Sequence, residues 1–472
     1  MPQPPADSQR PTQSFGDELV QLLKLGLPIA FVQFGMTALN LIDTALLGRH
    51  DEASIPVMML GNVLSFGATV FCMGAVTAID PLMSQAVGAS DHQAIPRLLG
   101  RGLLMSLMLS VPTALLLLPS ATWLTLLQQP EALIPEAARY AQLQALGVLP
   151  FLWYAVLRSL LSAHARLWPQ VVTIVVGNAA NFALDWLLIF GNWGLPELGA
   201  TGAATTTVVC RWLMLLGLCA FGWRDIAPQL KRLRDPLIRA RAFALAPLGR
   251  LLRLGAPIGT QFCLEWGAFG AVGLLVGYFD TIGGSANGNG PNLGGHQVTM
   301  LLASLSFMVP LGLGIAASVR VGWAVGRQDN VAVRRSVLVA LCTGAGMMSG
   351  FMLLFLLLPE QLARLLSTHE EMVAIATVLI PIAGVFQIGD GIQVVAVGCL
   401  RGLGDMRSAV LANIVGFWLI GLTVGILLAF PGGFGPRGLW WGLVIGLFVV
   451  AVGLLFVLRL RVGQKRSRLS FD

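Results

Sequence analysis

Charged side chains are scarce in this chain, since Asp, Glu, Lys and Arg make up 11% of its 472 residues, against about 25% in a typical soluble protein. Hydrophobic residues make up 56%. Uncharged runs such as Leu103–Leu118 and Leu439–Leu458 are typical of helices that cross a bilayer, each of which needs about 20 apolar residues. Their length argues against a β-barrel, whose strands are short and alternate in polarity. We therefore expect an all-α polytopic membrane protein.

Motifs for catalysis and nucleotide binding are also missing. The sequence contains no HExxH, no GxSxG and no CxxC pair. Its six cysteines lie in apolar spans, so we interpret them as packing residues. The segment Gly283–Gly295 is rich in glycine, but none of the three lysines (Lys24, Lys231, Lys465) follows a glycine, as a phosphate-binding loop requires. We expect no enzyme, no cofactor and no use of ATP, so that any transport would draw on an ion gradient.

Twelve stretches are long and apolar enough to span a membrane, and each half of the chain carries six of them. They cover approximately residues 23–47, 56–84, 98–118, 138–162, 170–191, 199–222, 253–279, 296–321, 334–358, 372–399, 408–430 and 437–458.

The net charge of +7 is distributed unequally across the membrane. With the N-terminus in the cytoplasm, the outer loops hold only Arg49, Arg139, Arg364 and Arg437, and Arg211 falls inside the sixth span. Basic residues prefer the cytoplasmic side, so both termini are expected there. The basic segment 225–252 is interpreted as a surface connector and not as a nucleic-acid site.

Short motifs of the first half recur in the second. The pairs are Lys24–Ile29 with Arg253–Ile258, Ala86–Asp91 with Ala324–Asp329, and Leu157-Arg158 with Leu400-Arg401. Because six spans return the chain to its starting side, the two repeats are expected to be parallel and related by a pseudo-two-fold axis along the membrane normal, a plan common in transporters. We predict a cytoplasmic tail at 1–19, which we expect to be disordered, an N-lobe at 20–224, the connector at 225–252, a C-lobe at 253–460 and a second tail at 461–472.

Five acidic residues fall inside the predicted spans: Asp43, Asp80, Asp185, Glu265 and Asp390. Ionisable groups at this depth are costly and mark functional sites. No lysine and, among arginines, only Arg211 is expected at comparable depth. A buried carboxylate without a fixed partner takes up a proton or recruits a metal cation, so these acids predict cation coupling.

Amide side chains accompany the acids at helical spacing. They are Asn178 and Asn181 before Asp185, Asn40 before Asp43, Gln387 and Gln393 around Asp390, and Gln261 before Glu265. Amide and carboxylate oxygens suit hard cations such as Na⁺, which predicts a Na⁺ or H⁺ site at either acid cluster. The alternative is that these groups only bond neighbouring helices, and for Asp80 the two interpretations are equally weighted. Arg211 either pairs with an acid such as Asp185 or reaches toward the cytoplasmic interface.

Three stretches carry a family resemblance: Asp43–Gly48, Gly177–Gly199 and Val394–Asp405. From about residue 20 to 460 the sequence resembles the multidrug and toxic compound extrusion (MATE) family, in particular its NorM-type bacterial branch. The resemblance implies two six-helix lobes in a V, and a monomeric alternating-access antiporter in the bacterial inner membrane. Such a protein would export amphipathic, often cationic drugs in exchange for Na⁺ or H⁺, and so confer antibiotic resistance.

The resemblance also implies site residues. It places an N-lobe cation site on Asp43, Asn181, Asp185 and Thr207, and a C-lobe acid pair on Glu265 and Asp390. Phe386 stands where NorM-type members can have a tyrosine. Asp185 stands where they can have an asparagine, so this chain has both the N-lobe and the C-lobe acids. Which of the two sets couples transport stays open. Further candidates for cation, substrate or gating roles are Asn178, Gln387, Asn40, Gln33, Gln261, Phe386, Asp80 and Arg211. A flippase for lipid-linked precursors is the alternative function, and it would need a cluster of basic residues in a central cavity.

Overall fold

The computed structural model describes residues 14–51, 54–284, 290–464 and 469, and within these ranges the chain forms helices and turns without a strand. The remainder of the two predicted tails (1–13, 465–468 and 470–472) and the middle of the glycine-rich loop (285–289) lie outside the described residues. Eleven helices of the described part are long and apolar enough to cross a membrane, and a twelfth span results when α6 and α7, bent by 42°, count as one. The twelve predicted spans are confirmed.

Contacts between Cα atoms divide the chain into two compact units, the second of which covers Val32–Gly259. It contains the later part of α1 (Phe15–His50), the first part of α12 (Leu245–Ile282), and the helices between them. These are α2 (Ser54–Val76), α3 (Ile79–Gly88), α4 (Ala94–Leu117), α5 (Ser120–Leu126), α6 (Ile134–Ala145), α7 (Val148–Ala163), α8 (Trp168–Leu188), η1 (Asn192–Gly194), α9 (Gly199–Phe221), α10 (Trp223–Arg232) and α11 (Pro236–Ala242). The predicted connector is therefore largely helical.

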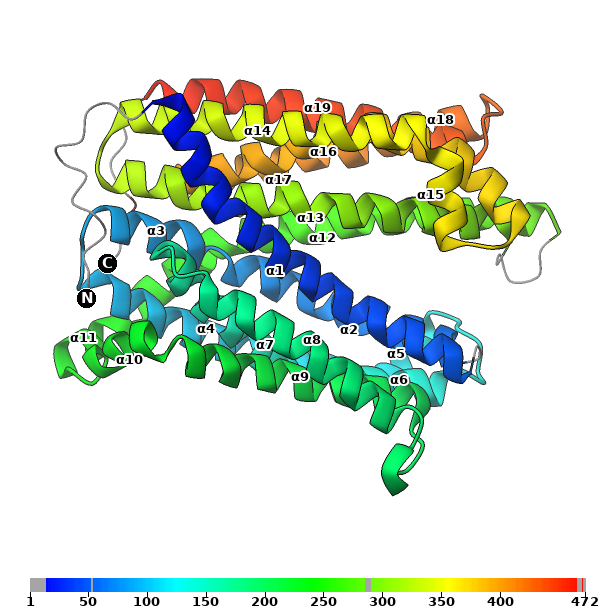
Figure 1. Ribbon diagram of the computed structural model, residues 1–472, viewed down its shortest axis with the longest axis horizontal. Coiled ribbons are helices and arrows are strands. Elements are labelled where there is room, and N and C mark those ends of the chain that lie inside the picture. The colour runs from blue at the N-terminus through cyan, green and yellow to red at the C-terminus, as the bar shows by residue number, and fades with distance from the viewer. Residues whose placement is uncertain (1–13, 52–53, 285–289, 465–468, 470–472) are drawn as a thin grey trace. The chain divides into compact units, whose positions relative to one another are not determined.

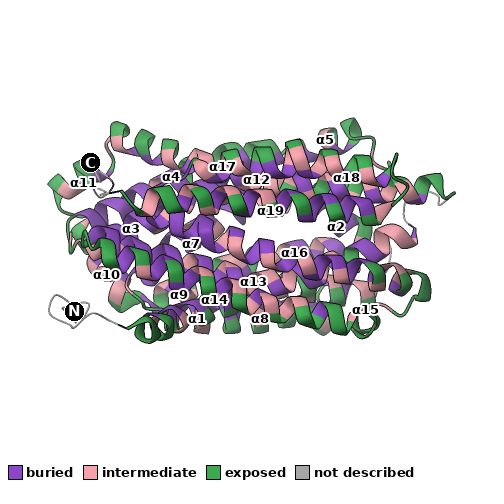
Figure 2. Ribbon diagram, turned by 90° about the horizontal axis from the view of Figure 1, so that it is seen from above, coloured by how far each residue is buried: buried purple, intermediate pink, exposed green. Residues whose placement is uncertain are grey.

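The first unit joins the start of α1, up to Phe31, to the chain from Thr260 onward. Its further helices are α13 (Pro291–Gly326), α14 (Asn330–Leu357), α15 (Pro359–Leu366), α16 (Glu370–Gly402), α17 (Ser408–Asn413), a π-helical stretch η3 (Ile414–Gly421), α18 (Leu422–Ala429) and α19 (Pro436–Val462). In Figure 1, α13, α14, α16 and α19 run alongside one another. In the apolar stretch of α16 that is long enough to cross a membrane, 56% of the residues are buried, against 17% in the corresponding stretch of α12. Helix α16 is therefore the central helix of this unit (Figure 2).

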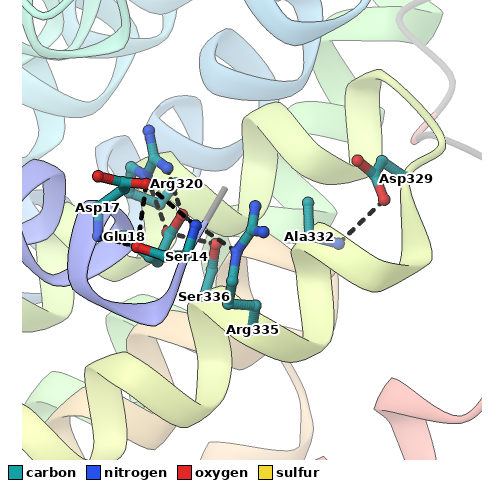
Figure 3. Close-up of polar contacts among 8 residues, drawn as sticks. All are labelled: Ser14, Asp17, Glu18, Arg320, Asp329, Ala332, Arg335 and Ser336. Carbon is teal, nitrogen blue, oxygen red and sulfur yellow. Dashed lines mark hydrogen bonds and ion pairs between the residues drawn. The ribbon is translucent and has the colours of Figure 1, made fainter. Parts of the chain in front are cut away.

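Helix α1 begins at Phe15, which brings the last five residues of the predicted tail into the helix. Ser14 caps it, because its hydroxyl oxygen accepts the amide of Asp17 at 3.1 Å while Asp17 accepts the amide of Ser14 at 3.0 Å. Glu18, 1% exposed, then binds Arg320 of α13 at 2.5 Å and Ser336 of α14 at 2.6 Å (Figure 3). The sequence shows no partner for Glu18, because both partners lie about 300 residues away.

Two close backbone contacts recur in the two repeats. A Cβ added at Gly312 of α13 would lie 2.5 Å from Cα of Ala30 on α1, and one added at Gly74 of α2 would lie 2.7 Å from Cα of Gly259 on α12. Both contacts lie inside a compact unit. The division falls within α1 and α12, so each of these helices contributes residues to both units. The lobe boundaries expected from the repeat stay a prediction.

Candidate functional site

Four of the expected N-lobe residues meet inside the second unit. Asp43 of α1 accepts hydrogen bonds from Asn181 Nδ2 of α8 at 2.8 Å and from Thr207 Oγ1 of α9 at 2.9 Å. Asp185 lies one helical turn beyond Asn181 on the same face of α8. Asp43 is 2% exposed, and Asn181 and Asp185 are fully buried. The residues that the resemblance implied thus form one buried cluster.

Asp185 is the unusual member of this cluster. Neither of its carboxylate oxygens receives a hydrogen bond from a described residue, and the same holds for Oδ1 of Asn181. The Asp185 carboxyl is close enough to that of Asp43 for their charges to interact. Arg211 places its guanidinium over the ring of Phe151 at 5.3 Å and is close enough to Asp43 for their charges to interact, but it forms no ion pair with either acid within the described ranges. Two adjacent buried carboxylates without a bound countercharge require a proton or a metal cation between them.

Thr207 can serve either charge state of Asp43. Its hydroxyl lies 2.9 Å from Asp43 Oδ2 and 3.0 Å from the carbonyl oxygen of Ala203. A hydroxyl has one hydrogen and can also accept. It can therefore donate to an ionised Asp43, or accept from a protonated Asp43 while donating to the carbonyl of Ala203. Both arrangements use the same heavy-atom positions.

Two other N-lobe candidates are placed differently. Asn178 donates to the backbone oxygens of Gly35 at 3.1 Å and Ile174 at 2.8 Å, which ties α8 to α1. The side chain of Asn40 is exposed and makes no hydrogen bond to the described part of the chain. The structure does not bring either amide to Asp43 by a hydrogen bond.

A second polar cluster surrounds Glu265 of α12 in the first unit. Its Oε1 accepts Nε2 of Gln261 at 3.0 Å, Nε2 of Gln393 of α16 at 2.9 Å and Nδ2 of Asn413 of α17 at 2.8 Å. Asn413 was not expected at the site, although an asparagine in the apolar eleventh span is itself a signal. The π-helical stretch η3 begins directly after Asn413. Short π-helical stretches inside α-helices are frequent at functional sites.

The rest of the expected C-lobe set lies beside this cluster. Asp390 of α16 is 8% exposed and close enough to Glu265 for the two charges to interact. Gln387 donates instead to Ser306 Oγ at 2.7 Å. Phe386 packs against Phe269 and Trp440, with ring centroids 6.1 and 6.5 Å apart. Within the described residues, no three His, Cys, Asp or Glu side chains converge as a metal-binding group. A metal ion at either cluster would therefore have at most two carboxylate ligands.

Two arginines that were not among the expected deep residues bond glutamines on neighbouring helices. Arg158 of α7 donates to Oε1 of Gln33 on α1, and Arg401 of α16 donates to Oε1 of Gln261 on α12 at 3.0 Å. Sequence position placed both arginines at span ends, whereas their long side chains reach glutamines of neighbouring helices.

Asp80 accepts a hydrogen bond from Ser159, which joins α3 to α7. The interpretation of Asp80 as a residue that bonds neighbouring helices gains support from this contact.

Comparison with known proteins places these sites in a family. The MatE family model matches residues 28–187 and 257–427, one segment in each repeat. The Probable multidrug resistance protein NorM of Bradyrhizobium diazoefficiens is 36% identical over 97% of this chain and 96% of its own length. The Multidrug resistance protein NorM of Burkholderia vietnamiensis is 34% identical over 96% of both chains.

Solved structures share the fold. The eukaryotic MATE transporter AtDTX14 superposes with a TM-score of 0.80 at 23% identity, covering 94% of this chain and 96% of its own. A MOP superfamily transporter from Pyrococcus furiosus superposes with a TM-score of 0.83 at 18% identity, covering 96% and 99%. Matched family segments in both repeats, relatives above 30% identity over nearly the whole length and a shared helical fold agree with one another. The chain belongs to the MatE family of membrane transporters, the multidrug and toxic compound extrusion family, in its NorM-type branch.

Proposed function

We propose that this protein exports amphipathic, often cationic drugs across the bacterial inner membrane in exchange for H⁺ or Na⁺. The observation that carries the proposal is the Asp43–Asp185 pair. Both carboxylates are at least 98% buried, and no described donor satisfies Asp185. A group that binds and releases a cation needs such a site, because a permanent ion pair would hold the charge in place.

The exchange follows from linkage. Cation binding and drug binding favour different conformations, so each ligand lowers the affinity for the other, and the coupling is reciprocal. The energy comes from the ion gradient and not from ATP. The relatives named as multidrug resistance proteins support drugs as the substrate class. Both termini would lie in the cytoplasm, as the distribution of arginine and lysine predicts. The protein would act as a monomer.

Efflux of a fluorescent cationic dye from membrane vesicles tests the proposal, with a pH gradient and a Na⁺ gradient imposed separately. The wild type is expected to export dye under at least one gradient. Asp43→Asn and Asp185→Asn should abolish the gradient dependence, because each removes one of the two charges that the cation neutralises. Glu360→Gln, which changes a carboxylate that is 57% exposed on α15, is the matched control and should export like the wild type.

Retention of ion-dependent efflux by both Asp variants would refute the N-lobe assignment, and Glu265→Gln and Asp390→Asn would then be compared in the same way. Absence of dye efflux under either gradient would refute the antiport itself. The flippase alternative predicts this second outcome, together with gradient-independent movement of a lipid-linked substrate.

A further inference from the structure

Each repeat joins an arginine to a glutamine by a hydrogen bond, a pairing that we call a clamp. In the second unit Arg158 of α7 donates to Gln33 of α1, and in the first unit Arg401 of α16 donates to Gln261 of α12. The arginines belong to the repeated motifs Leu157-Arg158 and Leu400-Arg401. Arg401 is held further by Phe262, whose ring centroid lies 5.3 Å from its Cζ. Each clamp therefore joins the helix of the fourth span to that of the first span within its repeat.

Among the described residues, the glutamine of the C-terminal clamp bonds an acid, whereas that of the N-terminal clamp does not. Gln261 stands four residues before Glu265 on α12 and donates to it, whereas the residue four positions after Gln33 is Thr37. A guanidinium has donors only, so the atom of Gln261 that faces Arg401 must be its oxygen. The amide nitrogen of Gln261 must then face Glu265. Arg401 thus fixes which end of the amide the acid meets.

The fixed amide leaves Glu265 with two unlike oxygens. Oε1 accepts three N–H groups, which replace part of the hydration that a carboxylate loses on burial. Oε2 accepts no hydrogen bond from any residue in the described ranges. Nearby, the side-chain oxygens of Gln393 and Asn413 are buried without a donor from the same ranges. Unsatisfied buried oxygens beside a carboxylate provide a place for a positive charge.

We propose that Arg401 is a positioning residue for cation binding at Glu265, acting through Gln261. It keeps the amide nitrogen on Oε1, so that Oε2 takes the cation and the amide oxygen of Gln261 is withheld from it. The inference rests on the proposed cation-coupled exchange and adds a positioning residue, Arg401, to the C-terminal acid cluster already expected. Loss of the guanidinium frees the amide to turn its oxygen toward Glu265, which stabilises a bound proton or Na⁺.

Cation titration of the purified full-length protein tests this without requiring transport. Tryptophan fluorescence is a suitable signal, because Nε1 of Trp418 donates to the carbonyl oxygen of Leu264 at 3.1 Å, next to Glu265. Na⁺ is titrated at fixed pH, and pH is varied at fixed Na⁺. Arg401→Met is expected to lower the half-saturating cation concentration by roughly threefold to tenfold, the size of one reoriented hydrogen bond to a charged group. Arg401→Lys keeps a donor for Oε1 of Gln261 and should restore the wild-type value.

A double-mutant cycle separates positioning from simple charge removal. Gln261→Leu is expected to shift the titration in the same direction as Arg401→Met, and the double variant should match Gln261→Leu alone. Additive shifts would show that Arg401 acts through its charge and would overturn the proposal. Arg158→Met, at the equivalent clamp of the other unit, should leave the half-saturating concentration unchanged.

Two further results would also overturn it: a wild-type titration for Arg401→Met, or no saturable cation response in the wild type. The separate vesicle efflux assay distinguishes these failures from failure of the proposed exchange. Ion-driven efflux with no role for Arg401 refutes this inference alone. Size-exclusion chromatography of each variant, with Arg401→Lys as the conservative reference, identifies a variant that has not folded.

Discussion

Replacing Thr207 with valine tests the hydroxyl that is available to both charge states of Asp43. Valine has the shape of threonine but neither donates nor accepts, so its branched side chain still fits the helix. The hydroxyl now lies 2.9 Å from Asp43 Oδ2 and 3.0 Å from the carbonyl of Ala203. In the variant, both the ionised and the protonated acid lose this partner. Thr207→Ser keeps the hydroxyl and is the matched control.

The size of the effect follows from the difference between two hydrogen bonds. A bond to an ionised carboxylate contributes about 1.5–3 kcal/mol and a bond between neutral groups about 0.5–1.5 kcal/mol. Their difference of about 1–1.5 kcal/mol corresponds to a change of roughly fivefold to twelvefold in the cation concentration that half-saturates exchange. If the coupling ion is H⁺, the Thr207→Val protein should need less of it, because the ionised state loses more. If the ion is Na⁺, the variant should need more, because an oxygen ligand is lost.

Dye efflux from proteoliposomes, measured as a function of pH at constant Na⁺ and of Na⁺ at constant pH, provides the assay. Thr207→Ser is expected to follow the wild type in both series. A Thr207→Val protein that matches the wild type in both series would refute this role of the hydroxyl, as would a serine variant that is as impaired as the valine variant. Either result would show that the hydroxyl does not respond to the charge of Asp43.

Two stability predictions concern the packing of α1. Glu18→Gln removes the charge that pairs with the buried guanidinium of Arg320, and it should cost about 3–5 kcal/mol of unfolding free energy. The control Glu370→Gln, at a carboxylate that is 73% exposed, should cost less than about 1 kcal/mol. Thermal unfolding in detergent measures the stability of both variants. Equal melting temperatures would contradict the assignment of Glu18 to a stabilising buried ion pair. Gly312→Ala should cost about 1–3 kcal/mol because its Cβ would meet Ala30 of α1. Gly346→Ala should be neutral or stabilising, because no heavy atom lies within 4 Å of the added Cβ. A destabilised Gly346→Ala protein would show that the contact with Ala30 is not the cause of the loss in Gly312→Ala.

The acids, and the polar face that they share with neighbouring amides on one helix, were predictable because both follow from residue type and spacing along the sequence. An acid in an apolar span is conspicuous, and the spacing of Asn181 and Asp185 places both on one face of α8. The meeting of Asp43, Asn181 and Thr207 required the family resemblance, since three separate helices supply them. Periodicity orients a side chain on its own helix and does not determine which helix faces it.

Long polar side chains account for most of what the sequence did not show. Arg401 is only just beyond the tenth predicted span, yet its guanidinium reaches Gln261 on α12. Glu18 was assigned to a disordered tail because the apolar pattern begins later, and it is held by partners on α13 and α14. Asn413 was overlooked because it is the single amide in its span without an acid nearby in sequence. In each case the deciding contact joins residues more than 100 positions apart.

The reciprocity of coupling provides the most direct test of the central claim. Wild-type protein in proteoliposomes is given a drug gradient and no ion gradient, and the internal pH and Na⁺ are followed with fluorescent indicators. If exchange is coupled through the acid pair, H⁺ or Na⁺ moves against the direction of drug flow, and Asp185→Asn abolishes this ion movement. Drug flow that carries neither ion in the opposite direction would contradict the account.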